Sequence, residues 1–393
     1  RKIYPRELLI TLTEREPSAL WQRNGEISVI AADGTVIDEM RDDRYAALPL
    51  VVGEEANERL KDYLALIEAA GALAERVKAG TYVSGRRWTL KLDGVDIRLP
   101  ETGATEALAA SLLALVSPGD EVVLFEPMYD AYLPIIRQAG GIPRFVTLRP
   151  PHFRLDEAAL AEAFSERTRV VVLNNPLNPT ATMFEEQDLA LLARFCQRFD
   201  VTAICDEVWE HVTFDGRPHR PLIGFDGMRD RTVKIGSAGK IFSLTGWKVG
   251  FVMAAPALLR VVANAHQFLT FTTPPNLQEA VAYGLAKDDA YFESMRADLA
   301  RSRDRLAAGL SRIGFTVLPS AGTYFLSVDI AGLAADDVAF CERIVSEHGV
   351  AAIPVSAFYE GGSVNNLVRF CFAKTDATLD AAVERLAGLF PRT

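Results

Sequence analysis

Three short apolar segments, each followed at once by polar residues, constrain the fold of this chain more than any other feature. They span residues 170–173, 201–205 and 232–235. Mainly apolar segments of this length are typical of strands buried on both faces of a parallel sheet. Helical patterns such as residues 185–199 separate them. This alternation predicts a parallel sheet with helices on both faces, in a large α/β domain over residues 101–285.

The two ends of the chain differ from this middle part. A long polar helix at 290–313 and strands at 323–328 and 367–372 predict a smaller α+β domain over residues 286–393. Residues 1–100 are predicted to form a partial, mainly-β module. Its expected elements are strands at 8–13 and 26–30, a turn at Asp33-Gly34, a helix at 57–70 and a hairpin around Asp93-Gly94 that ends at Pro100.

Composition excludes several function classes. The formal net charge of −10 disfavours a nucleic-acid partner, which would need a basic surface. We find no apolar run of the roughly 18–20 residues that a membrane span needs, and no signal peptide. The four cysteines and five histidines lack metal-ligand spacing, so no metal site is predicted. So few scattered cysteines are typical of a reducing compartment, and we expect a cytoplasmic protein.

Polar side chains follow all three buried strands at their carboxyl ends. Asn174 to Pro179 follow the first strand, Asp206 to Trp209 the second, and Ser237 to Lys240 the third. In an open α/β sheet, ligands bind in the crevice outside the carboxyl ends of the strands. The sequence therefore predicts a binding crevice at this edge.

Seven segments at and around these positions resemble one family. They are TGATEAL (102–108), FEPMYDAY (125–132), NNPLNPT (174–180), CDEVWEH (205–211), GSAGKIFSLTGWKVG (236–250), GTYF (322–325) and VRF (368–370). In this order they resemble the class I and II aminotransferases of pyridoxal-phosphate (PLP) fold type I, and most of all the branch that handles kynurenine, glutamine or methionine. The resemblance implies PLP as cofactor, an amino acid and a 2-oxo acid as substrates, and a homodimer.

The resemblance also assigns the two catalytic residues. Lys240 would form the Schiff base with PLP and, once displaced by substrate, would shuttle a proton. A solvated surface lysine is the alternative. Asp206 would pair with the pyridine nitrogen and keep it protonated, so that the ring withdraws electrons. Its alternative is a helix N-cap.

Three further residues would contact the ring or the substrate. Asn178 would bond the phenolic oxygen of the ring and the substrate carboxylate, or else it is a turn residue before Pro179. Tyr129 would stack on the ring face, with core packing as its alternative. Arg369 would clamp the substrate carboxylate, unless it forms a salt bridge at a domain interface.

The phosphate of the cofactor would lie at a helix N-terminus, where backbone N–H groups converge. Ala104 and Thr105 open the predicted helix at 105–116, and Ser237 and Lys248 would add a hydroxyl and a charge. Lys248 could instead be solvated. Trp209 is also expected to bind the cofactor. The family usually has at this position a tyrosine bonded to the phenolic oxygen of the ring, whereas an indole N–H can donate a hydrogen bond but cannot ionise or accept one.

Residues 1–100 resemble a different protein, the periplasmic β domain of the bacterial division protein FtsQ. The matching segments are residues 12–38, 48–60 and 83–101. An intact aminotransferase would carry a substrate-gating segment before TGATEAL, which is expected to be missing here. The second hypothesis is therefore a division-linked module that binds protein partners through residues 1–100, fused to an impaired enzyme domain. Its periplasmic resemblance conflicts with the cytoplasmic expectation.

Overall fold

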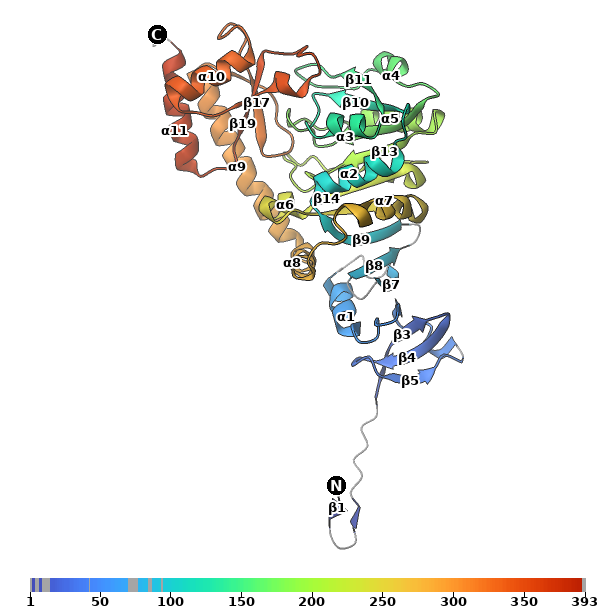
Figure 1. The fold of residues 1–393 in the computed structure, drawn as a ribbon. Helices are drawn as coiled ribbons and strands as arrows, with labels where there is room; N and C mark the ends of the chain where they lie inside the picture. The colour runs from blue at the N-terminus through green and yellow to red at the C-terminus, as the bar shows by residue number, and fades with distance from the viewer. Residues whose placement is uncertain are drawn as a thin grey trace. The chain divides into compact units, whose positions relative to one another are not determined.

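The structure, a computed structural model, describes residues 2–3, 7–8, 15–41, 43–69, 77–83, 87–92 and 95–390. The chain divides into two compact units, Arg1–Leu99 and Pro100–Thr393 (Figure 1). Within the described ranges, no helix is long and apolar enough to cross a membrane.

The first unit is built mainly from strands. Its elements are β1 (Lys2–Ile3), β2 (Glu7–Leu8), β3 (Pro17–Arg23), β4 (Glu26–Ala31), β5 (Val36–Glu39), β6 (Leu50–Val52), α1 (Leu60–Ala69), β7 (Val77–Val83), β8 (Arg87–Leu92) and β9 (Val95–Thr102). Strands β3, β4 and β5 form an antiparallel meander, β6 runs parallel to β3 and β7, and β7, β8 and β9 are antiparallel. Leu60 and Tyr63 of α1 pack with Trp21, Val51 and Trp88 in one apolar core.

Most elements predicted for this unit are confirmed. The strand at 26–30, the helix at 57–70 and the strands on either side of Asp93-Gly94 are present, although the turn itself lies outside the described residues. The strand predicted at 8–13 also falls outside them beyond Leu8. The prediction that Pro100 ends its strand is wrong, because β9 continues to Thr102. Proline fits extended backbone and costs only the hydrogen bond of its missing N–H.

Six strands of the second unit are neighbours in one sheet, in the order β11-β10-β12-β13-β14-β15, and we refer to them as the six-stranded sheet. Its strands are β10 (Glu121–Glu126), β11 (Ile142–Thr147), β12 (Thr168–Asn174), β13 (Thr202–Asp206), β14 (Thr232–Ser237) and β15 (Val249–Ala254). All neighbours are parallel except β14 and β15. Alternate residues of β10 pack into two different hydrophobic clusters. Val122 and Leu124 belong to one cluster, and Val123 and Phe125 belong to the other. The sheet is therefore covered on both faces, as predicted.

The helices of this unit fall into two groups. Those packed around the six-stranded sheet are α2 (Ala104–Leu115), α3 (Tyr132–Gln138), α4 (Glu157–Ala163), α5 (Glu186–Arg198), α6 (Ala238–Ile241), α7 (Pro256–Leu269) and α8 (Pro275–Leu285). The long α9 (Asp289–Ile313) leads to α10 (Asp337–His348) and α11 (Asp376–Leu386). These three accompany a second, antiparallel sheet, β16-β17-β19-β18, made of β16 (Thr316–Val317), β17 (Phe325–Asp329), β18 (Ile353–Pro354) and β19 (Leu367–Cys371).

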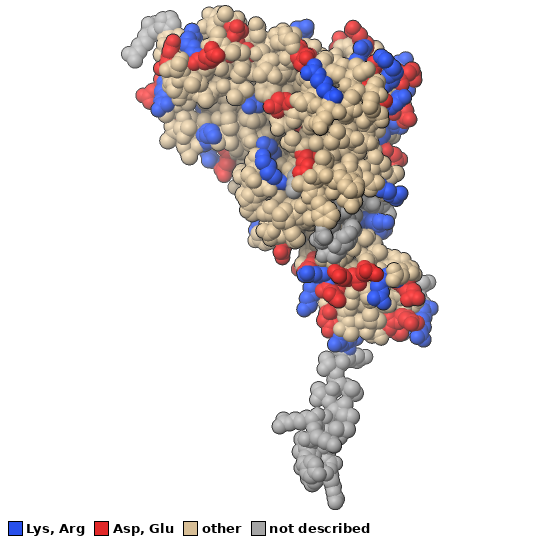
Figure 2. Space-filling model, in the orientation of Figure 1, with Lys and Arg blue, Asp and Glu red and all other residues tan. Residues whose placement is uncertain are grey.

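The predicted α/β core and the α+β region after residue 286 are both present, with element ends within two residues of those predicted. On the face that Figure 2 shows, acidic and basic side chains are interspersed over the surface of the described residues. Between them lies a broad area of uncharged surface on the second unit.

Candidate active site

Three neighbouring parallel strands end at polar residues on one edge of the sheet. Strand β12 ends at Asn174, β13 at Asp206 and β14 at Ser237. Asn174 is in register with Asp206, which places the two strand ends side by side. A cavity of about 620 Å³ opens at this edge. Its volume is that of a site for a small molecule or cofactor.

Asp206 is almost fully buried in the wall of this cavity. The hydroxyl of Tyr132 donates a hydrogen bond to its Oδ2 atom at 2.5 Å, whereas Oδ1 has no hydrogen-bond partner among the described residues. Burial raises the pKa of Asp206 to about 6, against the opposing effects of the Tyr132 hydrogen bond, the nearby Val208 backbone N–H and the charge of Lys240. A buried acceptor without a partner is costly. A protonated ring nitrogen in the cavity would satisfy it, so the residue fits that group.

Lys240 lies on α6 and lines the same cavity. Its Nζ atom donates to the hydroxyl of Tyr324 at 3.2 Å and lies 4.9 Å from the centroid of the Trp209 ring. Burial lowers the pKa of Lys240, although the neighbouring Tyr129 and Asp206 oppose this shift. A lowered pKa increases the fraction of neutral amine, which is the nucleophilic form.

A helix N-terminus forms a further wall of the cavity. Helix α2 begins at Ala104, and its first N–H groups have no acceptor within the helix. Thr105, Ser237 and Lys248 line the cavity near this terminus. A Cβ atom on Gly250 would lie only 2.8 Å from the backbone nitrogen of Ala104, so this glycine permits the close approach of β15. Backbone donors, a hydroxyl and an ammonium group together fit a phosphate.

A chain of hydrogen bonds connects the strand end at Asp206 to the second sheet. The Arg369 guanidinium donates from Nη1 to Oδ1 of Asn178 at 2.6 Å. The Asn178 backbone N–H donates to Asn174 Oδ1, and Asn174 Nδ2 donates to the backbone oxygen of Asp206, both at 2.8 Å. Arg369 also stacks over Phe325, with 4.1 Å from its Cζ atom to the ring centroid. Burial lowers the pKa of Arg369, as expected of a cation kept in a partly dry site.

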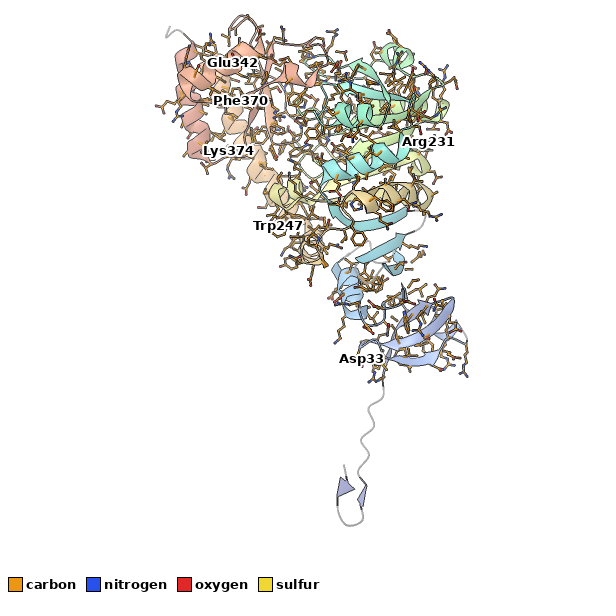
Figure 3. All side chains as sticks on the ribbon, viewed as in Figure 1. Asp33, Arg231, Trp247, Glu342, Phe370 and Lys374 are labelled. Atoms are coloured by element: carbon orange, nitrogen blue, oxygen red, sulfur yellow. The ribbon has the colours of Figure 1, made fainter. Side chains whose placement is uncertain are left out.

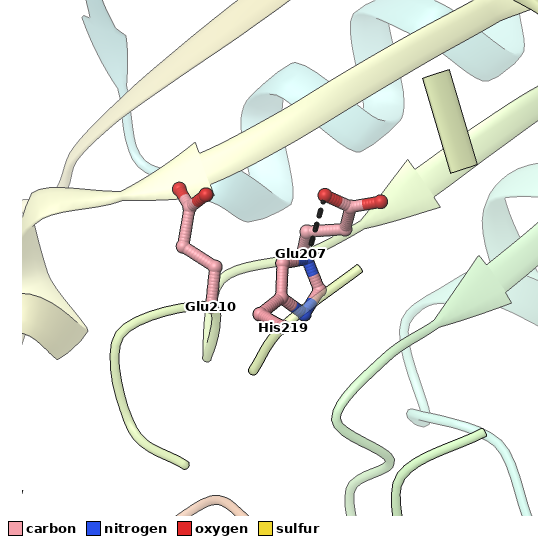
Figure 4. A group of neighbouring side chains, drawn as sticks. All are labelled: Glu207, Glu210 and His219. Carbon is pink, nitrogen blue, oxygen red and sulfur yellow. Dashed lines mark hydrogen bonds and ion pairs between the residues drawn. The ribbon is translucent and has the colours of Figure 1, made fainter. Parts of the chain in front are cut away.

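A cluster of titratable side chains is formed by Glu207, which follows Asp206 in the sequence, with Glu210 and His219 (Figure 4). His219 Nε2 lies 2.9 Å from Glu207 Oε2, and Glu210 completes a group with the spacing of metal ligands. The Lys234 ammonium, however, lies 2.5 Å from Glu210 and 3.8 Å from Glu207. Because this cation already neutralises the carboxylates, we assign the cluster to anchoring the segment after β13 and not to binding a metal.

The cavity brings together residues that are far apart in the sequence. Nine of the predicted site residues line it: Ala104, Thr105, Tyr129, Asn178, Asp206, Trp209, Ser237, Lys240 and Lys248. Arg369 does not line it and reaches it through Asn178. Two residues were missed, Tyr132 and Tyr324. Both lie inside the segments that carry the family resemblance, but their partners are 74 and 84 residues away, and no local pattern indicates either contact.

Comparison with known proteins identifies relatives of the same kind. A sequence model of the family described as "Aminotransferase class I and II" matches residues 55–386. A probable N-succinyldiaminopimelate aminotransferase of Mycobacterium tuberculosis is 44% identical over 317 residues, covering 76% of this chain and 80% of that protein. The methionine aminotransferase of Escherichia coli is 42% identical over 288 residues, covering 73% and 75%.

Solved structures agree with the sequence matches. The N-succinyldiaminopimelate aminotransferase from M. tuberculosis superimposes with a TM-score of 0.74 at 42% identity, covering 82% of this chain and 83% of that one. The E. coli methionine aminotransferase also gives 0.74, at 40% identity and 82% of each chain. None of these matches supports the predicted resemblance of residues 1–100 to FtsQ. The family match begins at residue 55, within the segment predicted to be unrelated to it.

Proposed function

The chain belongs to the class I and II aminotransferases, and we propose that it acts through Lys240 as the residue that carries the cofactor. Members of this family are PLP-dependent, and the chain is accordingly an enzyme that moves an amino group from an amino acid to a 2-oxo acid. The observation that supports Lys240 most directly is its position. Its amine and the partnerless Oδ1 of Asp206 line one cavity, which the α2 N-terminus also borders.

Each wall of the cavity would contact a different portion of PLP. Asp206 would accept from the ring nitrogen, the α2 N-terminus with Ser237 and Lys248 would bind the phosphate, and Tyr129 would cover the ring face. When bound, the protonated ring withdraws electrons from the substrate carbon that loses its proton. Because Asp206 is buried at the end of β13, its carboxylate would hold the ring nitrogen from a fixed position.

Lys240 would also transfer a proton during the reaction. Its amine lies in the cavity, and its lowered pKa makes the neutral form more accessible. A neutral amine can accept a proton at Nζ and donate it again, as a general base and then a general acid. Asn178 and Arg369 would meanwhile hold the substrate carboxylate in a forked arrangement of donors.

The substrate is proposed from the relatives and from the site together. The names of the two relatives above give N-succinyldiaminopimelate and methionine, and a rat relative at 36% identity is a kynurenine–oxoglutarate transaminase. The first two are amino acids with long unbranched side chains. We therefore propose an unbranched amino donor and a 2-oxo acid acceptor, both bound through their carboxylates.

We also propose a homodimer. Several large apolar side chains are exposed around α7 and α8, namely Trp247, Val261, Phe268, Leu269, Phe271, Tyr283 and Tyr291. Trp247 is labelled in Figure 3. Large exposed apolar areas often mark protein interfaces. Light scattering should give twice the chain mass, and Phe268→Asp, at a side chain 87% exposed, should shift the protein towards monomer.

We further propose a division into two aminotransferase domains and a cytoplasmic location. The boundary near residue 286, before α9, would separate the large cofactor-binding domain from the small one. A cytoplasmic location is supported by the four cysteines, which are all free thiols. Cell fractionation with an antibody to the chain would test the location directly.

The decisive experiment uses the visible absorbance that PLP gains when a lysine binds it. The purified chain with PLP should show this band, and adding methionine, glutamine or kynurenine should bleach it as the amino group is transferred. Lys240→Ala should abolish the band, whereas Lys61→Ala, at an exposed lysine of the first unit, should leave it unchanged. A band that survives Lys240→Ala would disprove the assignment.

A further inference from the structure

The Lys240 amine has two aromatic neighbours that differ in what they can offer it. The ring of Trp209 lies 4.9 Å from Nζ and that of Tyr324 lies 5.6 Å from it, so both rings can attract a cation through their faces. The indole N–H of Trp209 is a donor only and cannot accept a hydrogen bond. The Tyr324 hydroxyl, 3.2 Å from Nζ, can accept one.

Tyr324 is held in this position from three sides. Its ring meets Trp209 edge-on, with centroids 4.4 Å apart and planes at 90°. Its backbone oxygen accepts a hydrogen bond from the N–H of Phe372 at 3.0 Å, and Phe372 directly follows β19 of the second sheet. The N–H of the preceding residue, Thr323, donates to the backbone oxygen of Val212 at 2.9 Å. This bond connects the segment before β17 to the segment that carries Trp209.

The backbone at this point is strained. Thr323 has a φ of 63°, a region that β-branched residues rarely adopt. Its side-chain Oγ1 accepts from Phe325 N–H at 3.1 Å, which compensates part of the cost. Strain of this kind persists where the surrounding structure fixes it, and it is concentrated at functional sites. Here it sets the direction from which the Tyr324 hydroxyl reaches the Lys240 amine.

We propose that Tyr324 is the positioning residue for Lys240, whose amine it holds by a hydrogen bond from the small-domain side of the cavity. This inference rests on the proposed function of Lys240. The hydroxyl restricts the rotation of the long lysine side chain, so that Nζ stays near the cavity both before it meets the cofactor and after a substrate has displaced it. Burial raises the pKa of Tyr324, so the phenol stays neutral and acts through its hydrogen bond.

Tyr324→Phe removes the hydroxyl and keeps the ring that packs on Trp209. We expect kcat to fall about 2–13-fold, the effect of losing one hydrogen bond of typical strength. KM should change less than about twofold, because the substrate carboxylate contacts other residues. Tyr45→Phe, in the first unit, is the matched control and should leave both constants unchanged.

A second measurement avoids turnover altogether. The cofactor-free protein is labelled with acetic anhydride over a range of pH, and the Lys240 peptide is quantified by mass spectrometry. Because Tyr324 accepts from the charged amine, its loss should lower the pH midpoint for Lys240 labelling further. The midpoint should stay constant in Tyr45→Phe, and thermal melting should confirm that both variants are folded.

The outcomes separate this inference from the function on which it rests. An unchanged Lys240 midpoint together with an unchanged kcat in Tyr324→Phe would overturn the positioning role while leaving the transaminase assignment intact. A shifted midpoint in a wild-type protein that never bleaches with any amino acid would support the contact and refute the proposed function. A rise in KM with constant kcat would also overturn the inference, because it would assign Tyr324 to substrate binding.

Discussion

The two sides of the cavity are built in different ways. On the side of Asp206, the polar groups come from the ends of adjacent parallel strands, and Asn174, Asp206 and Ser237 are all buried. On the side of Arg369, they come from a loop and from the second sheet, and Asn178, Tyr324 and Arg369 are only half-buried. One sheet fixes the first side, whereas packing between two sheets fixes the second.

This difference separates two tasks of the site. A cofactor that stays bound through many turnovers benefits from a rigid, dry wall, where an electrostatic contact needs no reorganisation. Substrates must enter and leave, and side chains that remain partly exposed permit this. We therefore expect changes on the strand-end side to affect cofactor binding and kcat. Changes of Asn178 or Arg369 on the opposite side should affect KM, whereas Tyr324 should affect kcat because it acts through Lys240.

The largest effect is expected for Asp206→Asn, on the strand-end side. The amide keeps the size of the side chain but cannot hold a positive charge on the ring nitrogen. We expect kcat to fall about 10²–10³-fold, the range found when one group that stabilises developing charge is removed. Steady-state kinetics at saturating substrate and cofactor would measure it.

The control for that change is Asp33→Asn, at an exposed carboxylate of the first unit that pairs with Arg15. It should leave kcat unaltered. A change confined to KM in Asp206→Asn would contradict the division of tasks between the two sides.

Arg369→Lys tests the opposite side. Lysine keeps the charge but loses the fork that can bind a carboxylate and Asn178 together. We expect kcat/KM to fall about 10–100-fold for the amino acid and for the 2-oxo acid alike, mostly through KM, as when a charged hydrogen bond is lost. The visible band of the bound cofactor should be preserved, and its loss would show that the two sides are not independent.

The sequence predicted the strand-end side better than the other. Asp206, Ser237 and Lys240 each follow a buried apolar strand, so a local pattern placed them at one edge. No such pattern links Arg369 to Asn178, 191 residues earlier, because the contact depends on how two sheets pack. Their proximity could be expected only from the family resemblance. Tyr132 was missed for the same reason, since α3 must pack on the sheet before its hydroxyl meets Asp206.

A smaller effect concerns the pH dependence of cofactor binding. Burial raises the pKa of Asp206 to about 6, and only the ionised carboxylate can hold a protonated ring nitrogen. Below pH 6 the apparent affinity for PLP should therefore fall about tenfold per pH unit, as one proton must be released on binding. Fluorescence titration from pH 5 to 8 would show this slope, and Asp206→Asn should lack it.

The stability of the cofactor-free protein should change in the opposite direction. Because the folded-state pKa of Asp206 lies above its unfolded value near 4, this group stabilises the fold most at low pH. That contribution is lost as the pH rises through about 6. The difference in unfolding free energy between the wild type and Asp206→Asn should follow this course, and a pH-independent difference would contradict the raised pKa.

The smallest effect is expected for Tyr132→Phe, which keeps the ring and removes the donor to Asp206. The hydrogen bond favours the ionised carboxylate, so its loss should move the midpoint of PLP binding to higher pH. At pH 8, where Asp206 stays ionised, affinity should change only a few-fold, within the range for one hydrogen bond. Tyr359→Phe, whose hydroxyl bonds a backbone oxygen of Leu148 instead, is the matched buried control. An unmoved midpoint in Tyr132→Phe would mean that the strand ends alone set the charge of Asp206, which would sharpen the contrast between the two sides of the cavity.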